Sequence, residues 1–285
     1  MPLDPDTLLN WNFGKVEQTF SRKDAMLYAL GIGLGADPLD RDQLRYVYER
    51  ELAAFPTLPV VLGTPGAWLA NPATTVTRRK VVHGEIRLDL HGPIPVEGTI
   101  RAEPRVTGLT DKGADKGALI FQERRITDAA DGRPIATVRG VTFARADGGF
   151  GGDPAPLRGL PPVPDRAPDE RLTARTFPWQ ALLYRLSGDM NPLHADPDAA
   201  RNAGYDRPIL HGLATFGVLA VPLLGHICDG DPARLATLEG RFSAPVMSGD
   251  ALVLDVWHTE DGAAFEARVP DREVTVFNRG RLIAR

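Results

Sequence analysis

A carboxylate, a carboxamide and an imidazole occur close together in the chain, at Asp189, Asn191 and His194. Carboxyl and imidazole groups serve as general acids and bases when burial or a close partner moves their pKa values towards neutrality. Adding water to a double bond needs a base that deprotonates the water and an acid that protonates the neighbouring carbon. We therefore take Asp189 and His194 as a candidate acid–base pair for this chemistry.

The segment that carries these residues is predicted to be an irregular loop. Asn191 precedes Pro192, and a proline disfavours helical geometry at the residue before it. Downstream, Asp196 is a typical helix N-cap, Pro197 a typical first helical residue and Gly204 a typical C-terminal stop. A short helix would therefore hold the loop in place. Because Asp and Asn are also common turn residues, a purely structural role is the alternative interpretation.

A second candidate element begins at His211 and Gly212 and runs as a nearly continuous apolar stretch to Cys228. A helix that is apolar on every face has to be buried, and Pro222 is expected to kink this one or end it late. The first N–H groups of a helix lack partners within it and lie at the positive end of its dipole. The Gly212 amide is therefore a candidate oxyanion donor, and His211 and Leu193 are candidate pocket residues.

Glycine and proline are concentrated in residues 147–170, where they exclude a helix or a central strand. We predict that this segment links an N-terminal domain of residues 1–146 to a C-terminal domain of residues 171–285. The candidate loop lies in the C-terminal domain. Because the N-terminal domain has no loop of this kind, we expect a single site in the chain.

The two halves follow one plan. Residues 20–28 resemble residues 177–184, and residues 95–100 resemble residues 245–252, in the same order, which indicates an ancient duplication. Alternating apolar and β-branched residues predict β-strands at 81–90, 100–107, 118–127, 134–144, 251–258, 264–269 and 273–284. A curved antiparallel sheet around one buried helix accounts for this pattern. We therefore expect an α+β protein with a double hot-dog fold.

Composition narrows the classes of partner. The 285 residues carry a net charge of −4, which does not indicate the basic surface that binds nucleic acid. The single cysteine, Cys228, excludes an internal disulfide and fits a reducing compartment. The N-terminus shows no signal-peptide pattern, and the apolar stretch is shorter than the ~20 residues of a membrane span. We expect a cytoplasmic protein without nucleic-acid or membrane partners.

The candidate loop also resembles a known family. Tyr184-Arg-Leu-Ser-Gly-Asp-Met-Asn-Pro-Leu-His194, followed by Pro208-Ile-Leu-His-Gly-Leu213, is similar to the signature of the MaoC-like (R)-specific 2-enoyl-CoA hydratases, or type 2 enoyl-CoA hydratases. In the first half, Tyr28-Ala-Leu-Gly-Ile-Gly33 and His83-Gly-Glu85 resemble the non-catalytic N-terminal hot-dog of that family. The likeness covers nearly the whole chain.

The resemblance implies a role for each candidate. Asp189 and His194 would share and activate the water, Asn191 would fix the substrate or the water, and the Gly212 amide would bind the thioester carbonyl. The implied reaction is hydration of a trans-2-enoyl-CoA to a (3R)-3-hydroxyacyl-CoA, or the reverse dehydration. No metal or other cofactor is implied, because CoA is part of the substrate, and a homodimer is expected. The first half would make room for the acyl tail, since its central helix, from about Pro56, reads as short and irregular. A purely structural partner domain is the alternative interpretation of this half.

Two other functions stay open on the sequence. Hot-dog folds also serve acyl-CoA thioesterases, which release a free thiol, and a fold does not determine a function. A non-catalytic acyl-thioester-binding protein is the other alternative. Binding alone requires no proton-transfer pair, so the joint presence of Asp189 and His194 favours an enzyme.

Overall fold

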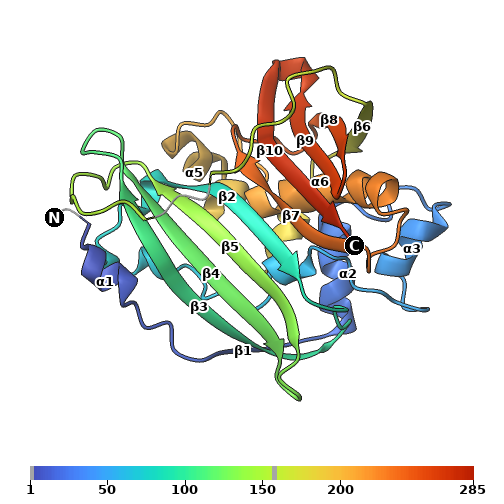
Figure 1. Cartoon of the computed structure of the whole chain (residues 1–285), viewed down its shortest axis with the longest axis horizontal. Coiled ribbons are helices and arrows are strands. Elements are labelled where there is room, and N and C mark those ends of the chain that lie inside the picture. The colour runs from blue at the N-terminus through green and yellow to red at the C-terminus, as the bar shows by residue number, and fades with distance from the viewer. Residues whose placement is uncertain (1–2, 156–158) are drawn as a thin grey trace.

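The computed structural model describes residues 3–155 and 159–285. Its strands form one antiparallel sheet of ten, curved into two halves that lie side by side (Figure 1). The first half contains β1 (Val16–Phe20), β2 (Val81–Leu90), β3 (Gly98–Asp111), β4 (Ala118–Asp128) and β5 (Pro134–Ala144). The second contains β6 (Glu170–Arg175), β7 (Leu235–Phe242), β8 (Ala251–Thr259), β9 (Gly262–Val269) and β10 (Val274–Ala284). The strands predicted from the sequence are all present, whereas the sequence reading missed β1, β6 and β7.

The two halves have the same strand order. The sheet runs β1-β3-β4-β5-β2 and then β7-β10-β9-β8-β6, so each half places its second strand at the joint and its first strand at the outer edge. At the joint, β2 pairs with β7 in antiparallel register. Arg87 pairs with Glu239, and Arg241 pairs with Glu85, across this joint. The repeated order supports the inferred duplication.

The described helices are α1 (Pro5–Leu9), α2 (Arg22–Gly31), α3 (Arg41–Val47), α4 (Gln180–Tyr184), α5 (Pro197–Asn202) and α6 (Gly212–Ile227). The longest of the described helices is α6, with 16 residues. Single 3₁₀ turns occur at η1 (Leu58–Val60), η2 (Trp68–Ala70), η3 (Pro72–Thr74), η4 (Arg78–Lys80), η5 (Arg185–Ser187), η6 (Pro192–His194) and η7 (Pro270–Arg272). None of the described helices is long and apolar enough to cross a membrane.

The buried helix predicted from the apolar stretch is α6, which the sheet of the second half wraps (Figure 1). Of the two expectations for Pro222, a late end of this helix was wrong, because the helix continues to Ile227, whereas a kink stays a prediction. Proline removes only one backbone hydrogen bond. Leu223 and Leu224, 0% and 3% exposed, pack into the core and hold the last turns in place.

The first half lacks a matching helix among the described residues. In its place the chain makes the 3₁₀ turn η1, whose residues Leu58, Pro59 and Val60 are all buried. The prediction of a short, irregular central element is therefore confirmed.

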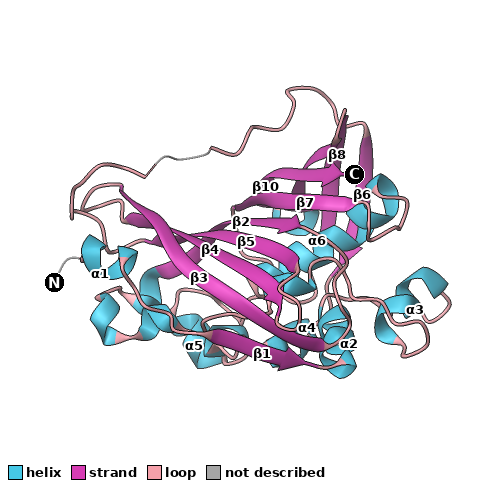
Figure 2. Ribbon diagram, turned by 60° about the horizontal axis from the view of Figure 1, so that its bottom comes forward, coloured by secondary structure: helices cyan, strands magenta, loops and turns pink. Residues whose placement is uncertain are grey.

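The segment predicted as a linker crosses from one half to the other. Its described parts form loops up to β6, which already begins at Glu170 (Figure 2). Residues 156–158 of this segment lie outside the described residues. The main-chain oxygens of Leu160 and Arg166 accept hydrogen bonds from Arg279 and Trp257 of the second half. The exact limits of the two domains stay a prediction.

The helix α6 packs closely against the end of α2 at Gly217, and the free energy of unfolding tests this contact. A Cβ atom at Gly217 would lie 2.4 Å from Ile32 Cγ2, whereas one at Gly225 in the same helix would meet no atom within 4 Å. We expect Gly217→Ala to lower the free energy of unfolding by roughly 1–2 kcal/mol, since overpacking outweighs the gain in helix propensity. Gly225→Ala should raise it by up to about 1 kcal/mol. Urea unfolding measures both, and shifts of the same sign would contradict the close contact.

Candidate active site

The loop that carries the candidate residues lies between two short helices, as predicted. It follows α4 and η5 and turns at Gly188, whose φ of +120° suits glycine. Asn191 accepts a hydrogen bond from Leu193 N at 3.1 Å and so begins the turn η6. Asp196 caps α5 through its side chain, which confirms the predicted cap. Short-range hydrogen bonds therefore define the course of the loop.

His194 is held in one orientation. Its Nδ1 atom donates a hydrogen bond of 2.9 Å to the carbonyl oxygen of Ile209, which leaves Nε2 with a free lone pair. The side chain is 8% exposed. Burial lowers the pKa of His194 below its usual value, although the Ile209 carbonyl and the Asp189 carboxylate act in the opposite direction. The imidazole is therefore neutral at neutral pH and is available as a base.

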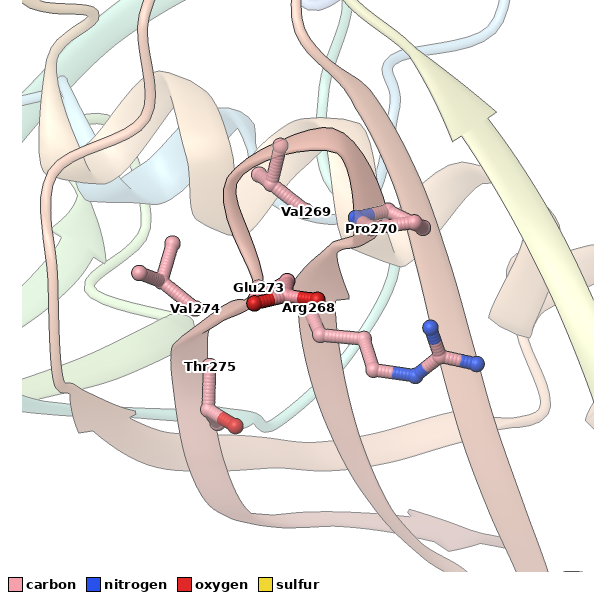
Figure 3. A pocket seen from close by; sticks show the side chains of 6 residues that line it. All are labelled: Arg268, Val269, Pro270, Glu273, Val274 and Thr275. Carbon is pink, nitrogen blue, oxygen red and sulfur yellow. The ribbon is translucent and has the colours of Figure 1, made fainter.

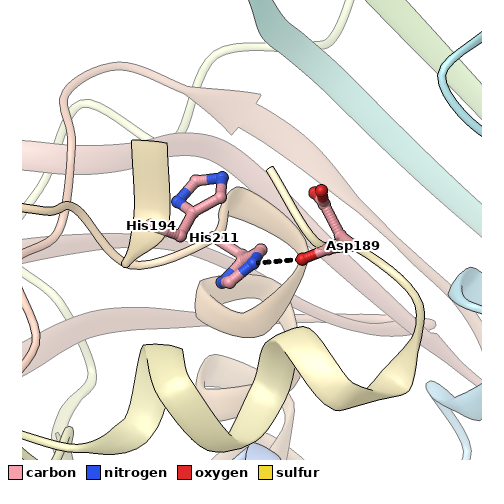
Figure 4. A group of neighbouring side chains, drawn as sticks. All are labelled: Asp189, His194 and His211. Carbon is pink, nitrogen blue, oxygen red and sulfur yellow. Dashed lines mark hydrogen bonds between the residues drawn. The ribbon is translucent and has the colours of Figure 1, made fainter. Parts of the chain in front are cut away.

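Asp189 presents its carboxylate next to this imidazole (Figure 4). The side chain is exposed, and one of its oxygens accepts a hydrogen bond from Asn191 N at 3.1 Å. A carboxylate oxygen of Asp189 lies within 4.8 Å of a ring nitrogen of His194. Two hydrogen bonds of about 2.8 Å can span such a gap through one water molecule.

His211 ties the loop to the start of α6. Its Nε2 atom donates a hydrogen bond of 3.1 Å to the main-chain oxygen of Asp189, and its ring stacks on His194 at 3.7 Å between centroids. The ring is 2% exposed, and burial together with the neighbouring His194 lowers its pKa to about 4. His211 therefore stays neutral and contacts both members of the candidate pair.

Gly212 is the first residue of α6, and His211 provides no side-chain cap there. The amide of Gly212 thus lies at a helix N-terminus, where donors lack partners within the helix. A Cβ atom at Gly212 would meet the Phe242 ring at an ordinary 3.5 Å, and the backbone has no positive φ there. The fold itself does not require glycine at this position. Leu193 is half-buried, and its role in a pocket stays a prediction.

A hollow opens at His194. The other residues that line it are Pro178, Ala181, Leu182, Ala195, Arg207, Pro208 and Ser248. Apolar groups dominate this set, which suits the carbon skeleton of a substrate. A second hollow lies at the turn between β9 and β10, and Figure 3 shows its lining residues, none of which belongs to the predicted site.

The group formed by Asp189, His194 and His211 has the residue types of a metal site, with one possible ligand atom from each within 4.8 Å of the others. The two imidazole rings, however, are stacked with only 25° between their planes. Nitrogen lone pairs lie in the ring plane, so both rings cannot aim at one ion without turning. The arrangement fits proton transfer better than metal binding.

Sequence reasoning did not find every residue near the site. His83 of β2 was taken only as part of a motif in the non-catalytic half, yet the charges of Asp189 and His194 influence its pKa. Phe242, which covers the start of α6, was missed as well. Both lie at the joint between the halves, and only the pairing of β2 with β7 brings them to the site.

Comparisons with known proteins agree over the whole chain. A family model described as "MaoC like domain" matches residues 160–278, and one described as "MFE-2 hydratase 2 N-terminal domain" matches residues 18–146. The enoyl-CoA hydratase ChsH3 of Mycobacterium tuberculosis is 37% identical over 287 residues, which cover 98% of each chain.

Solved structures show the same fold. A MaoC-like dehydratase from Phytophthora capsici matches with a TM-score of 0.85 and 31% identity over 98% of each chain. A Mycobacterium tuberculosis protein with a double hotdog fold matches with a TM-score of 0.54 and 18% identity, over 94% of this chain and 93% of that one, and shows the fold alone. The predicted double hot-dog is thus confirmed. The chain belongs to the MaoC-like family of type 2 enoyl-CoA hydratases.

Proposed function

We propose that this enzyme hydrates the double bond of a trans-2-enoyl-CoA to give a (3R)-3-hydroxyacyl-CoA, with Asp189 and His194 as the groups that activate water. One observation supports these roles above all: the Asp189 carboxylate and a nitrogen of His194 lie within 4.8 Å of each other beside the N-terminus of α6. The hydratase activity itself is what the names of the relatives state.

The water molecule, His194 and Asp189 account for every proton and electron pair that moves in the hydration. His194 Nε2 takes a proton from the water while the Asp189 carboxylate accepts the hydrogen bond of the second O–H. The oxygen adds to C3, and the π electrons of the double bond move onto the thioester oxygen. The imidazolium then returns the proton to C2 as the enolate collapses. The reverse sequence is the dehydration.

The charges that develop have partners. The thioester oxygen gains negative charge at the Gly212 amide, where the helix dipole and an unpaired N–H favour an anion. The imidazolium of His194 forms next to the Asp189 carboxylate, which favours the charged ring. Asn191 has its side-chain oxygen engaged with Leu193 N, so its NH₂ group is the part available to the water or the substrate.

We also propose a substrate carrier, a cofactor requirement, a compartment and an oligomeric state for this enzyme. The substrate carries CoA, the reaction needs no metal or redox cofactor, and the protein acts in the cytoplasm as a homodimer. The mass of the protein in solution, from light scattering, tests the dimer.

The activity itself is tested with trans-2-enoyl-CoA substrates. Hydration removes the ultraviolet band of the conjugated enoyl thioester, and chiral analysis of the product should give the 3R alcohol. A thioesterase would instead release thiol, which a thiol reagent detects. Release of thiol without loss of the double bond, or binding without turnover, would overturn the proposal.

Asp189→Asn and His194→Gln test the acid–base pair. Each should lower kcat for hydration by roughly two to four powers of ten, because general acid–base catalysis contributes on that scale. Asp271→Asn and His258→Gln serve as controls, since both side chains are exposed and lie outside the site. If all four variants kept kcat within a factor of two of the unmodified enzyme, the assigned roles would be wrong.

Gly212→Pro isolates the backbone donor. Proline fits the first position of a helix, and His211 already has the extended geometry, with ψ of +138°, that a residue before proline prefers. The variant should therefore fold but lose the N–H, with a fall in kcat of roughly 10²- to 10³-fold. Gly212→Ala keeps the N–H and should retain most of kcat. Equal losses in the two variants would argue against an amide contact with the thioester oxygen.

The pH dependence follows from the state of His194. Because burial lowers its pKa, the imidazole remains an unprotonated base at pH values where an ordinary histidine is charged. We expect kcat/KM to stay level from pH 8 to about 6.5 and to fall only below that value. Circular dichroism at each pH separates this loss from unfolding. Because the pKa of buried His211 is lowered to about 4, the unfolded chain binds a proton that the folded chain does not, and the free energy of unfolding falls as the pH drops from about 6.5 towards 4. An inflection above pH 7 would contradict this assignment.

A further inference from the structure

The strand β2 has two faces with different surroundings. Ile86, Leu88 and Leu90 are buried on the inner face, whereas Glu85, Arg87 and Asp89 form ion pairs on the outer face. Side chains alternate strictly along a regular strand. His83 would therefore share the outer face with Glu85 if the strand were regular.

A β-bulge at Gly84 changes this. On the neighbouring strand β5, His83 pairs with Thr142 and Glu85 pairs with Val141, so Gly84 is an extra residue in the ladder. A Cβ atom at Gly84 would lie 3.0 Å from the Val141 oxygen, which is why a glycine fits there. A bulge turns the side chains before it to the other face. His83 consequently lies on the inner face.

The surroundings of His83 place it at the active site. Its ring lies 6.2 Å from that of Phe242, edge to face, and Phe242 covers the backbone of Gly212. These residues therefore form a continuous wall from the first half to the start of α6. The side chain is exposed, so a ligand can reach it. Desolvation by the surrounding protein lowers the pKa of His83. The charges of Asp189 and His194 act on it as well.

A neutral imidazole can both donate and accept a hydrogen bond. Among the described residues none forms a hydrogen bond with the His83 side chain, and the aromatic ring beside it, that of Phe242, is apolar. The bulge thus exposes a free polar group on the wall that runs to the Gly212 amide. Resting on the hydratase function proposed above, we infer that His83 is a substrate-positioning residue that hydrogen-bonds the acyl portion of the enoyl thioester. The first half would then contribute a polar contact as well as space.

The test compares His83→Ala and His83→Gln with the unmodified enzyme on trans-2-butenoyl-CoA. Loss of one uncharged hydrogen bond should lower kcat/KM about three- to tenfold in His83→Ala, mainly through KM. His83→Gln keeps a donor and an acceptor and should recover kcat/KM to within about twofold. His258→Gln, an exposed histidine on β8, is the matched control and should change neither constant. Equal thermal midpoints exclude a loss of fold.

A truncated substrate identifies the part of the ligand that His83 contacts. The N-acetylcysteamine thioester of the same acid keeps the acyl portion and lacks most of CoA. If His83→Ala lowers kcat/KM by the same factor on both thioesters, the inference is supported. If kcat/KM on the truncated thioester is unchanged, the inference is overturned in favour of a contact with CoA. A fall in kcat as large as that of Asp189→Asn would also overturn it, because a positioning residue carries no proton.

The outcomes separate the two proposals. If the unmodified enzyme hydrates the substrate and His83→Ala matches it in KM and kcat, only the role of His83 fails. If the unmodified enzyme does not hydrate enoyl thioesters at all, the proposed function fails, and the role of His83 fails with it.

Discussion

The hydrogen bond from His211 Nε2 to the main-chain oxygen of Asp189 joins the two segments that the chemistry requires. One segment is the loop that carries the Asp189 carboxylate and the His194 imidazole, and the other is the start of α6. Because His211 is itself the residue before Gly212, this bond and the stacking on His194 fix the proposed acid–base pair relative to the proposed oxyanion donor. Groups that act together in a transition state need such fixed spacing. The Ile209 carbonyl, on the strand-like stretch that leads to His211, completes the arrangement by orienting His194.

Duplication of one fold explains how the two halves form one continuous sheet. The halves share a strand order, and the pairing of β2 with β7 makes one continuous sheet. Among the described residues the long helix belongs to the second half, and its N-terminus is the proposed oxyanion site. In the first half the turn η1 lies at the corresponding place, and its residues are buried. The two copies have therefore diverged most in their central element.

Sequence reasoning succeeded where the signal was local. The cap at Asp196, the loop around Asn191 and the helix that begins at Gly212 depend on neighbouring residues, and all are present. The strand β7 was missed, and its charged residues Glu239 and Arg241 have their partners Arg87 and Glu85 on the distant strand β2, which no local pattern shows. The position of His83 depends on a bulge in the pairing of β2 with β5, which no local pattern contains.

The stacked histidines show why one of them has to remain neutral. Two imidazolium rings at 3.7 Å would repel each other strongly, so only one of His194 and His211 can carry a proton charge at a time. Burial lowers the pKa of both rings, and that of His211, which is 2% exposed, falls to about 4. In the proposed mechanism His194 becomes the cation, next to a carboxylate that favours its charge. A more basic His211 would compete for that proton.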